Sequence, residues 1–113
     1  NQMKNYANFE QSKFLHEKGI TFGEPQFGDV YWTVHPDTEA IDNVVVGSAK
    51  WHIVALLEKF RAPSLSDLLK QIGGNYSVRC GDWWQLMKTT KAGAIAYQGE
   101  NPIDLILKHA YNF

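Results

Sequence analysis

A chain of 113 residues is long enough for one domain that buries a core without disulfides or a structural metal. Its 44% hydrophobic and 20% charged residues are typical of a folded globular protein, and a formal net charge of −1 gives no general attraction to nucleic acid or anionic membranes. The lone Cys80 excludes an intrachain disulfide, and no apolar run approaches the ~20 residues that span a bilayer, so we expect a single domain over residues 1–113 in the cytoplasm.

The first predicted element is a helix over residues 9–18. Asn8 and Gln11 have the spacing of a capping box, in which each side chain bonds the backbone N–H of the other residue. Gly19 can end the helix in a left-handed conformation. Residues 20–29 contain glycine and proline at irregular intervals, so we expect a loop there.

Two strands are expected next. Residues 30–34 are rich in β-branched and aromatic side chains, and the turn signal His-Pro-Asp follows at residues 35–37. Three valines at residues 44–46 predict a short strand that pairs antiparallel with the first. Residues 49–60 fit both a helical period and a strand alternation; their length and the Leu-Leu-Glu-Lys end favour a helix.

The best-specified helix begins near Ser64. Pro63 disfavours helical geometry in the residue before it, and Ser64 or Ser66 can accept hydrogen bonds from N–H groups of the first turn. Gly73 and Gly74 can end the helix without steric cost. The apolar residues recur at helical spacing and form one face: Leu65, Leu68, Leu69 and Ile72.

Three strands and a helix are predicted for the C-terminal part. Residues 76–80, 83–89 and 94–98 are joined by short turns, which predicts an antiparallel meander. The alternation in the middle strand places Trp83, Gln85 and Met87 on one face and Trp84, Leu86 and Lys88 on the other. Asn101 as cap and Pro102 at the first helical position begin the last helix.

These elements predict an α+β fold with one antiparallel sheet of four to five strands. The strand at residues 44–46 is expected at an edge of that sheet. The apolar face of the last helix, from Ile103 to Ala110, repeats at the same spacing as the face of the helix that begins at Leu65. We therefore expect these two helices, together with the helix at Phe9, to cover the same sheet.

Three segments of the chain carry a resemblance: EQSKFLHEKGI, APSLSDLLKQIGGNYSVRC and YQGENPIDLILKHAYNF. Their order resembles the EQxKxLxxxG, PxSLSxLL and GExPxx pattern of small uncharacterised proteins encoded by phages and prophages of Bacteroidetes-type gut bacteria. The resemblance covers most of the chain except residues 32–59, and Leu105 and Ile106 stand where relatives often carry small residues. It implies an α+β fold and a mobile-element origin, with no catalytic residues to transfer.

No pattern of catalytic or metal-ligating residues is evident. The histidines have no ligand spacing, so we expect no metal and no cofactor; they are His16, His35, His52 and His109. The glycines fit no phosphate-binding loop, dinucleotide fingerprint or nucleophile elbow. Cys80 could serve as a nucleophile with a distant histidine, but the favoured interpretation is a buried small hydrophobe at a strand end. We therefore predict no catalytic residues and favour a protein without enzymatic activity.

The aromatic residues carry more information. Tyr31-Trp32 and Trp83-Trp84 each put one ring on either side of a strand, so we expect one ring of each pair to face away from the helix-covered core. Such rings indicate a partner surface, or base stacking beside a basic residue such as Arg79. The structural alternative is that residues 32–60 cover the second face. Our candidate binding surface is Tyr31, Trp32, Trp83, Trp84 and Arg79.

Function is predicted from this surface. We expect a phage or prophage accessory protein that acts by protein–protein interaction, through a partner protein or through a homodimer edge, and not at a membrane. One alternative is a single-stranded nucleic-acid-binding module that uses an aromatic sheet face; the neutral charge and the lack of an RNP-like pattern disfavour it. The other alternative is a small enzyme that uses Cys80 and a distant histidine.

Overall fold

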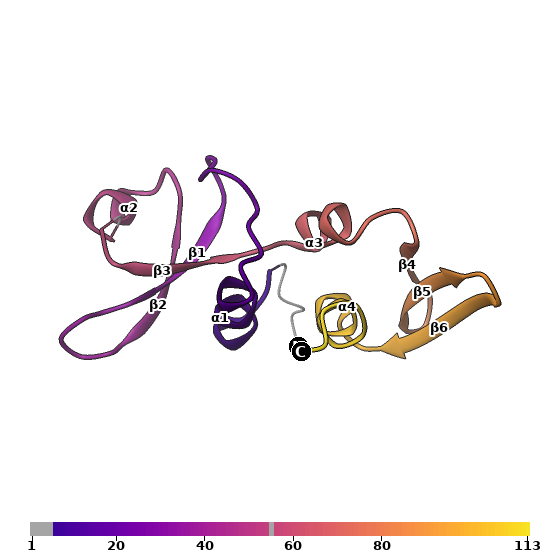
Figure 1. Ribbon diagram of the computed structural model, residues 1–113. Helices are drawn as coiled ribbons and strands as arrows, with labels where there is room; N and C mark the ends of the chain where they lie inside the picture. The colour runs from indigo at the N-terminus through magenta and orange to yellow at the C-terminus, as the bar shows by residue number, and fades with distance from the viewer. Residues whose placement is uncertain (1–5, 55) are drawn as a thin grey trace. The chain divides into compact units, whose positions relative to one another are not determined.

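Helices are interspersed among the strands in the computed structural model, which describes residues 6–54 and 56–113 (Figure 1). The described strands form two antiparallel sheets of three. The α+β class is therefore confirmed, but the expected single sheet of four to five strands is corrected to two smaller sheets. Each sheet lies in its own compact unit, Tyr6–Pro63 or Ser64–Phe113. None of the helices in the described part of the chain is both long and apolar enough to cross a membrane.

In the first unit, β1 (Val30–Val34) is the central strand between β2 (Ile41–Val45) and β3 (Glu58–Ala62). The predicted strand at residues 30–34 and its antiparallel pairing with the following valine strand are confirmed. Both neighbours pair with β1 along its whole length, and Tyr31 stands opposite Val44 on one side and Arg61 on the other. This register decides which side chains share a face of the sheet.

Helix α1 (Phe9–Glu17) begins with the predicted capping box. Asn8 Oδ1 accepts from the Gln11 N–H at 2.8 Å, and Gln11 Oε1 accepts from the Asn8 N–H at 2.9 Å. Beyond the helix, Gly19 has a φ of 77°, a left-handed conformation that favours glycine. The helix packs on β3, where the Phe9 and Phe60 rings meet edge to face at 5.8 Å.

The expected helix over residues 49–60 is wrong in its second half. Helix α2 (Ala49–Val54) is short, residue 55 lies outside the described residues, and β3 begins at Glu58. In α2 none of the six side chains is buried, whereas Phe60 and Ala62 of β3 are only 4% and 3% exposed. Pairing with β1 and burial of alternate residues thus outweigh the helical preference of the local sequence.

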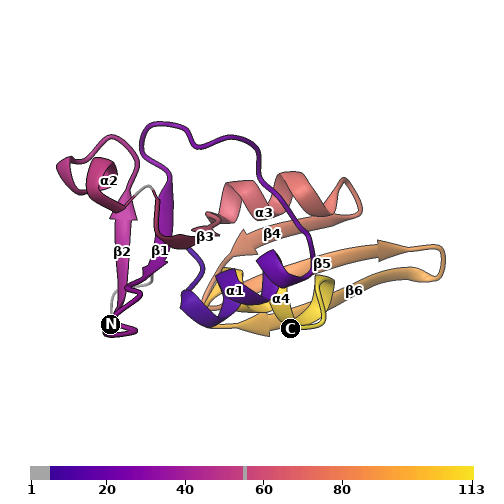
Figure 2. The ribbon, with the colours of Figure 1, turned by 60° about the vertical axis from the view of Figure 1, so that its left-hand side comes forward.

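In the second unit, the sequence predictions for all five elements are confirmed. They are α3 (Leu65–Ile72), β4 (Tyr76–Cys80), β5 (Trp84–Thr90), β6 (Gly93–Gly99) and α4 (Pro102–Ala110). Ser64 caps α3 and forms a capping box with Asp67, and the side chain of Asn101 accepts from the N–H groups at the start of α4. The three strands form the expected meander, in which β5 and β6 run side by side (Figure 2).

Among the described residues, helices cover one face of the β4-β5-β6 sheet, and the other face, which we call the open face, carries exposed side chains. Helix α4 packs on β5 and β6, and α3 packs on α4 and β4, so the expected placement of these two helices on one sheet is confirmed. Helix α1, expected on the same sheet, packs instead on β3 of its own unit. The fully buried side chains on the covered side are Leu68, Leu86, Ile106 and Leu107. On the open face, the exposed residues are Ser77, Arg79, Thr89, Ala94, Ala96 and Gln98.

Candidate functional site

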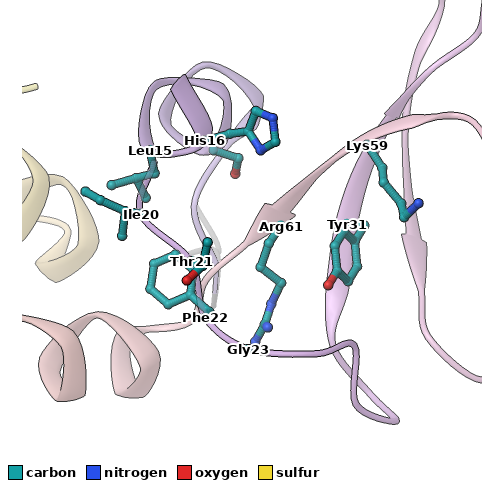
Figure 3. A pocket seen from close by; sticks show the side chains of 10 residues that line it. Leu15, His16, Ile20, Thr21, Phe22, Gly23, Tyr31, Lys59 and Arg61 are labelled. Atoms are coloured by element: carbon teal, nitrogen blue, oxygen red, sulfur yellow. The ribbon is translucent and has the colours of Figure 1, made fainter. Parts of the chain in front are cut away.

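A pocket of about 260 Å³ lies within the first unit, and we call it the Arg61 pocket (Figure 3). It is lined by residues of α1, of the loop at residues 20–23, and of strands β1 and β3. Tyr31 and Arg61 are cross-strand partners, and Lys59 precedes Arg61 by two positions on β3, so the three side chains share one face of the sheet. The left-handed Gly19 redirects the chain after α1 into the loop that forms the outer wall.

Arg61 is the central side chain of this pocket. Its guanidinium forms an ion pair with Asp29, at 3.2 Å between Nη2 and Oδ1, and the two side chains are only 14% and 18% exposed. The guanidinium carbon lies 5.9 Å from the ring centroids of both Phe22 and Tyr31. Figure 3 shows the Arg61 side chain between these two rings. Aromatic rings on both sides and a half-buried carboxylate hold the guanidinium in one orientation.

The other polar groups of the pocket suit hydrogen bonding to an anion. Burial raises the pKa of the Tyr31 hydroxyl, an effect that the positive charge of Arg61 opposes in part, so Tyr31 is a protonated donor at neutral pH. Thr21 and Lys59 also line this cavity. The Lys59 Nζ lies 5.9 Å from the centroid of the Trp51 ring, which provides a cation–π contact.

The net charge of these groups is positive. Among the described lining residues are two cations, Lys59 and Arg61, and no carboxylate. Asp29 is paired with Arg61, and Glu24 is exposed to solvent; both carboxylates help to raise the pKa of Tyr31 from outside the pocket lining. A cavity of this size is smaller than the ~300–1,000 Å³ of typical small-molecule sites. The pocket therefore fits a single carboxylate or phosphate group better than a whole cofactor.

Tyr31 and Trp32, two residues of the predicted binding surface, lie on opposite faces of β1. Tyr31 is 7% exposed, and its ring lies 5.3 Å from that of Trp51 in α2. Trp32 is half-buried against Phe9 and donates its indole N–H to the Ala7 carbonyl oxygen at 2.9 Å. Both faces of the sheet are thus covered at these two rings. This is the structural alternative that the sequence left open, and of these two residues Tyr31 lines the Arg61 pocket.

Trp83 and Arg79 lie together in the second unit, on the open face of the β4-β5-β6 sheet. They line a depression of about 400 Å³ with Gln85 and Gln98. The Trp83 side chain is 50% exposed, and Arg79 Nε donates to Gln85 Oε1 at 3.0 Å. The predicted alternation in β5 holds, since Leu86 is fully buried on the α4 side. Trp84 shares that side and is half-buried, so Trp83 is the ring that faces solvent.

Cys80 is exposed, which corrects the expectation of a buried thiol at a strand end. It lies at the last position of β4, in the same depression as Trp83, and its Sγ is 3.6 Å from the Gly81 carbonyl oxygen. The described residues that line this depression include no histidine, so the structure gives no catalytic partner for the thiol there. Over the described ranges, no three residues among His, Cys, Asp and Glu are grouped as metal ligands would be.

The sequence interpretation included Tyr31 among its candidate residues but missed the other polar residues of the Arg61 pocket. The loop expected at residues 20–29 is confirmed and contains Phe22 and Asp29, whereas Arg61 lies in a strand where a helix was expected to have just ended. A signal was present, because Lys59, Phe60 and Arg61 alternate polar and apolar as in a half-buried strand. The alternation is too short to outweigh the helical spacing of the preceding leucines.

Comparisons with known proteins identify no relative of this chain. No protein-family model matches the chain, and neither the curated proteins nor the solved structures contain a match. The resemblance to phage and prophage proteins therefore stays a prediction.

Proposed function

We propose that this is a binding protein that recognises an acidic segment of a partner protein, with one carboxylate of that segment seated in the Arg61 pocket. The observation that carries the proposal is that Lys59 and Arg61 both line one small cavity whose described lining includes no carboxylate. The proposal assigns the protein–protein interaction expected from the sequence to this pocket and to a carboxylate ligand.

The preorganisation of the pocket supports this proposal. The guanidinium of Arg61 is already oriented by Phe22, Tyr31 and Asp29, so binding an anion would cost little side-chain entropy. Lys59 is anchored along the Trp51 ring and adds a second positive charge. Hydroxyl groups of Thr21 and Tyr31 complete a set of donors for carboxylate oxygens.

A titration with model peptides tests the proposal. We expect hexaglutamate, but not hexaglutamine, to shift the backbone NMR signals of Thr21, Phe22 and Lys59. Lys59→Gln should weaken hexaglutamate binding about tenfold, because a hydrogen bond to a charged group contributes ~1.5–3 kcal/mol. Raising the salt concentration should weaken it further.

Lys13→Gln is the matched control, because Lys13 is an exposed lysine of α1 that does not line the pocket. It removes the same charge from the same unit and should leave binding within about twofold, the scale of a screened surface charge. Equal losses of hexaglutamate affinity in Lys59→Gln and Lys13→Gln would show only a general effect of charge and would overturn the proposal. Peptide-induced shifts confined to residues outside the pocket would do the same.

A second candidate function is favoured by Trp83 and Arg79. A half-exposed indole beside a guanidinium on an open sheet face is the arrangement on which single-stranded nucleic acids stack. If this face binds nucleic acid, a fluorescent dT oligonucleotide should bind at low salt. Binding should weaken about tenfold or more in Trp83→Ala, because base stacking contributes ~1–3 kcal/mol per base. Lys70→Gln, on the exposed side of α3, is the control; no binding by the wild-type protein at low salt would exclude this function.

A further inference from the structure

Strand β6 has an open outer edge in the second unit. The sheet order is β4-β5-β6, so within the described residues 6–54 and 56–113 a strand pairs with β6 on one side only. Its seven residues, GAIAYQG, contain no charged residue and no proline. Four of them near the turn, Gly93 to Ala96, are exposed, as is Gln98. Folded proteins normally block such an edge with charges, prolines or bulges, because its free N–H and C=O groups pair with any other strand.

The other edge strands carry the blocking residues that β6 lacks. Strand β2 contains Asp42, β4 contains Arg79, and β3 has the charged residues Glu58, Lys59 and Arg61 among its five. These strands are also shorter than β6 by two residues. An uncharged seven-residue edge therefore distinguishes β6 from the remaining edges of the two sheets.

The hydrogen-bond pattern identifies which groups of β6 point outward. The Thr89 N–H donates to the Asn75 carbonyl oxygen, so Thr89 directs its backbone groups toward β4. Successive residues of an antiparallel strand direct these groups to alternate sides. The backbone N–H and C=O groups of Lys88 and Thr90 therefore point toward β6. Those of their register partners, Ile95 and Gly93, point toward β5. The residues of β6 whose N–H and C=O groups face outward are Ala94, Ala96 and Gln98.

From this edge we infer that the protein forms a homodimer in which β6 pairs antiparallel with β6 of a second copy, centred on Ala96. The strand is self-complementary in that register. Ala96 stands opposite itself, and Ala94 stands opposite Gln98 of the other copy, with about six new backbone hydrogen bonds. Ile95 stands opposite Tyr97 at a non-hydrogen-bonded position, where side chains are closest and β-branched–aromatic pairs are favourable.

The surroundings of β6 are compatible with this arrangement. Ile95 is 45% exposed on the side that α4 covers, so pairing would bury an apolar side chain that now contacts water. Helix α4 packs on β5 and β6, with the His109 ring stacked on Tyr97 at 3.7 Å.

Sedimentation analysis of the full chain tests for the dimer. We expect the wild-type protein to be in a concentration-dependent monomer–dimer equilibrium. Ala96→Lys places two like charges directly opposite each other and should raise the dissociation constant about tenfold or more. Ser77→Lys is the matched control, since Ser77 is exposed on the same sheet face but on β4, at the other edge. It should leave the equilibrium unchanged.

Ala96→Lys can also weaken the dimer by destabilising the fold of each copy. The strand register is therefore tested separately on the wild-type chain. Cys80 is its single cysteine and is exposed, so it accepts one spin label. In the β6-to-β6 dimer five strand spacings separate the two β4 strands. Along the strands, Cys80 is level with Gly99, which lies three residues from the dimer centre at Ala96. The two Cα atoms would then lie ~30 Å apart.

Dipolar EPR should therefore show a distance near ~30 Å between labels. Pairing through the β4 edges would place the labels much closer and would overturn the inference. A protein that stays monomeric at the highest concentration reached would overturn it as well, as would a dimer that Ala96→Lys and Ser77→Lys weaken equally.

Discussion

At the scale of single residues, Arg61 connects stability and binding in the first unit. Its guanidinium holds the loop of residues 20–23 against the sheet through Phe22, and it neutralises the half-buried Asp29. A buried or half-buried charge is costly when its partner is removed, because the remaining ion keeps its desolvation penalty. The same side chain that shapes the pocket is thus required to keep that pocket folded.

Replacing Arg61 should therefore destabilise the protein. We expect Arg61→Ala to lower the free energy of unfolding by ~1–3 kcal/mol, since Asp29 would be left without this ion pair and Phe22 and Tyr31 would lose a cation between them. Urea denaturation followed by tryptophan fluorescence measures the change. Arg79→Ala removes an exposed arginine and should cost under ~1 kcal/mol. If the two substitutions cost the same, Arg61 has no special structural role.

At the scale of elements, the stacking of His109 on Tyr97 joins α4 to β6. Desolvation, aided by the positive charge of Lys108, lowers the pKa of His109 below its usual value of about 6.5. The folded unit therefore binds a proton less readily than the unfolded chain does. The stabilising contribution of neutral His109 is present above pH ~6.5 and is lost as the pH falls toward the lowered pKa.

A pH series on a variant tests this contact. We expect the difference in unfolding free energy between wild type and His109→Gln to shrink between about pH 7.5 and pH 5, as the wild-type imidazole becomes protonated. His52→Gln is the control, because His52 is exposed on α2. A difference for His109→Gln that stays constant over this pH range would show that protonation does not act on the packing of α4.

At the scale of the whole molecule, the binding features divide between two units that each have their own sheet. The cationic pocket belongs to the first unit, and the open sheet face and the unblocked β6 edge belong to the second. Tyr31 and Trp32 are packed on the two faces of β1, while Trp83 and Arg79 line one depression. The five residues proposed from the sequence as one surface are therefore distributed over several environments.

Capping and turn signals in the sequence were sufficient to locate most elements. Asn8, Ser64 and Asn101 cap the helices expected from them, because a cap requires only a side chain and N–H groups two or three residues away. The β4-β5-β6 meander was predictable for a similar reason, since short turns oblige neighbouring segments to pair.

Local signals therefore suffice for the α+β class, for the helix starts and for the alternation that directs Trp83 and Leu86 to opposite faces. They do not suffice for the strand at residues 58–62, because its stabilising partner is β1, more than twenty residues earlier in the chain. That pairing also brings Arg61 to Tyr31 and so forms the pocket. Local propensity reports on interactions within a few residues, whereas a sheet edge and a binding pocket depend on segments that meet only after folding.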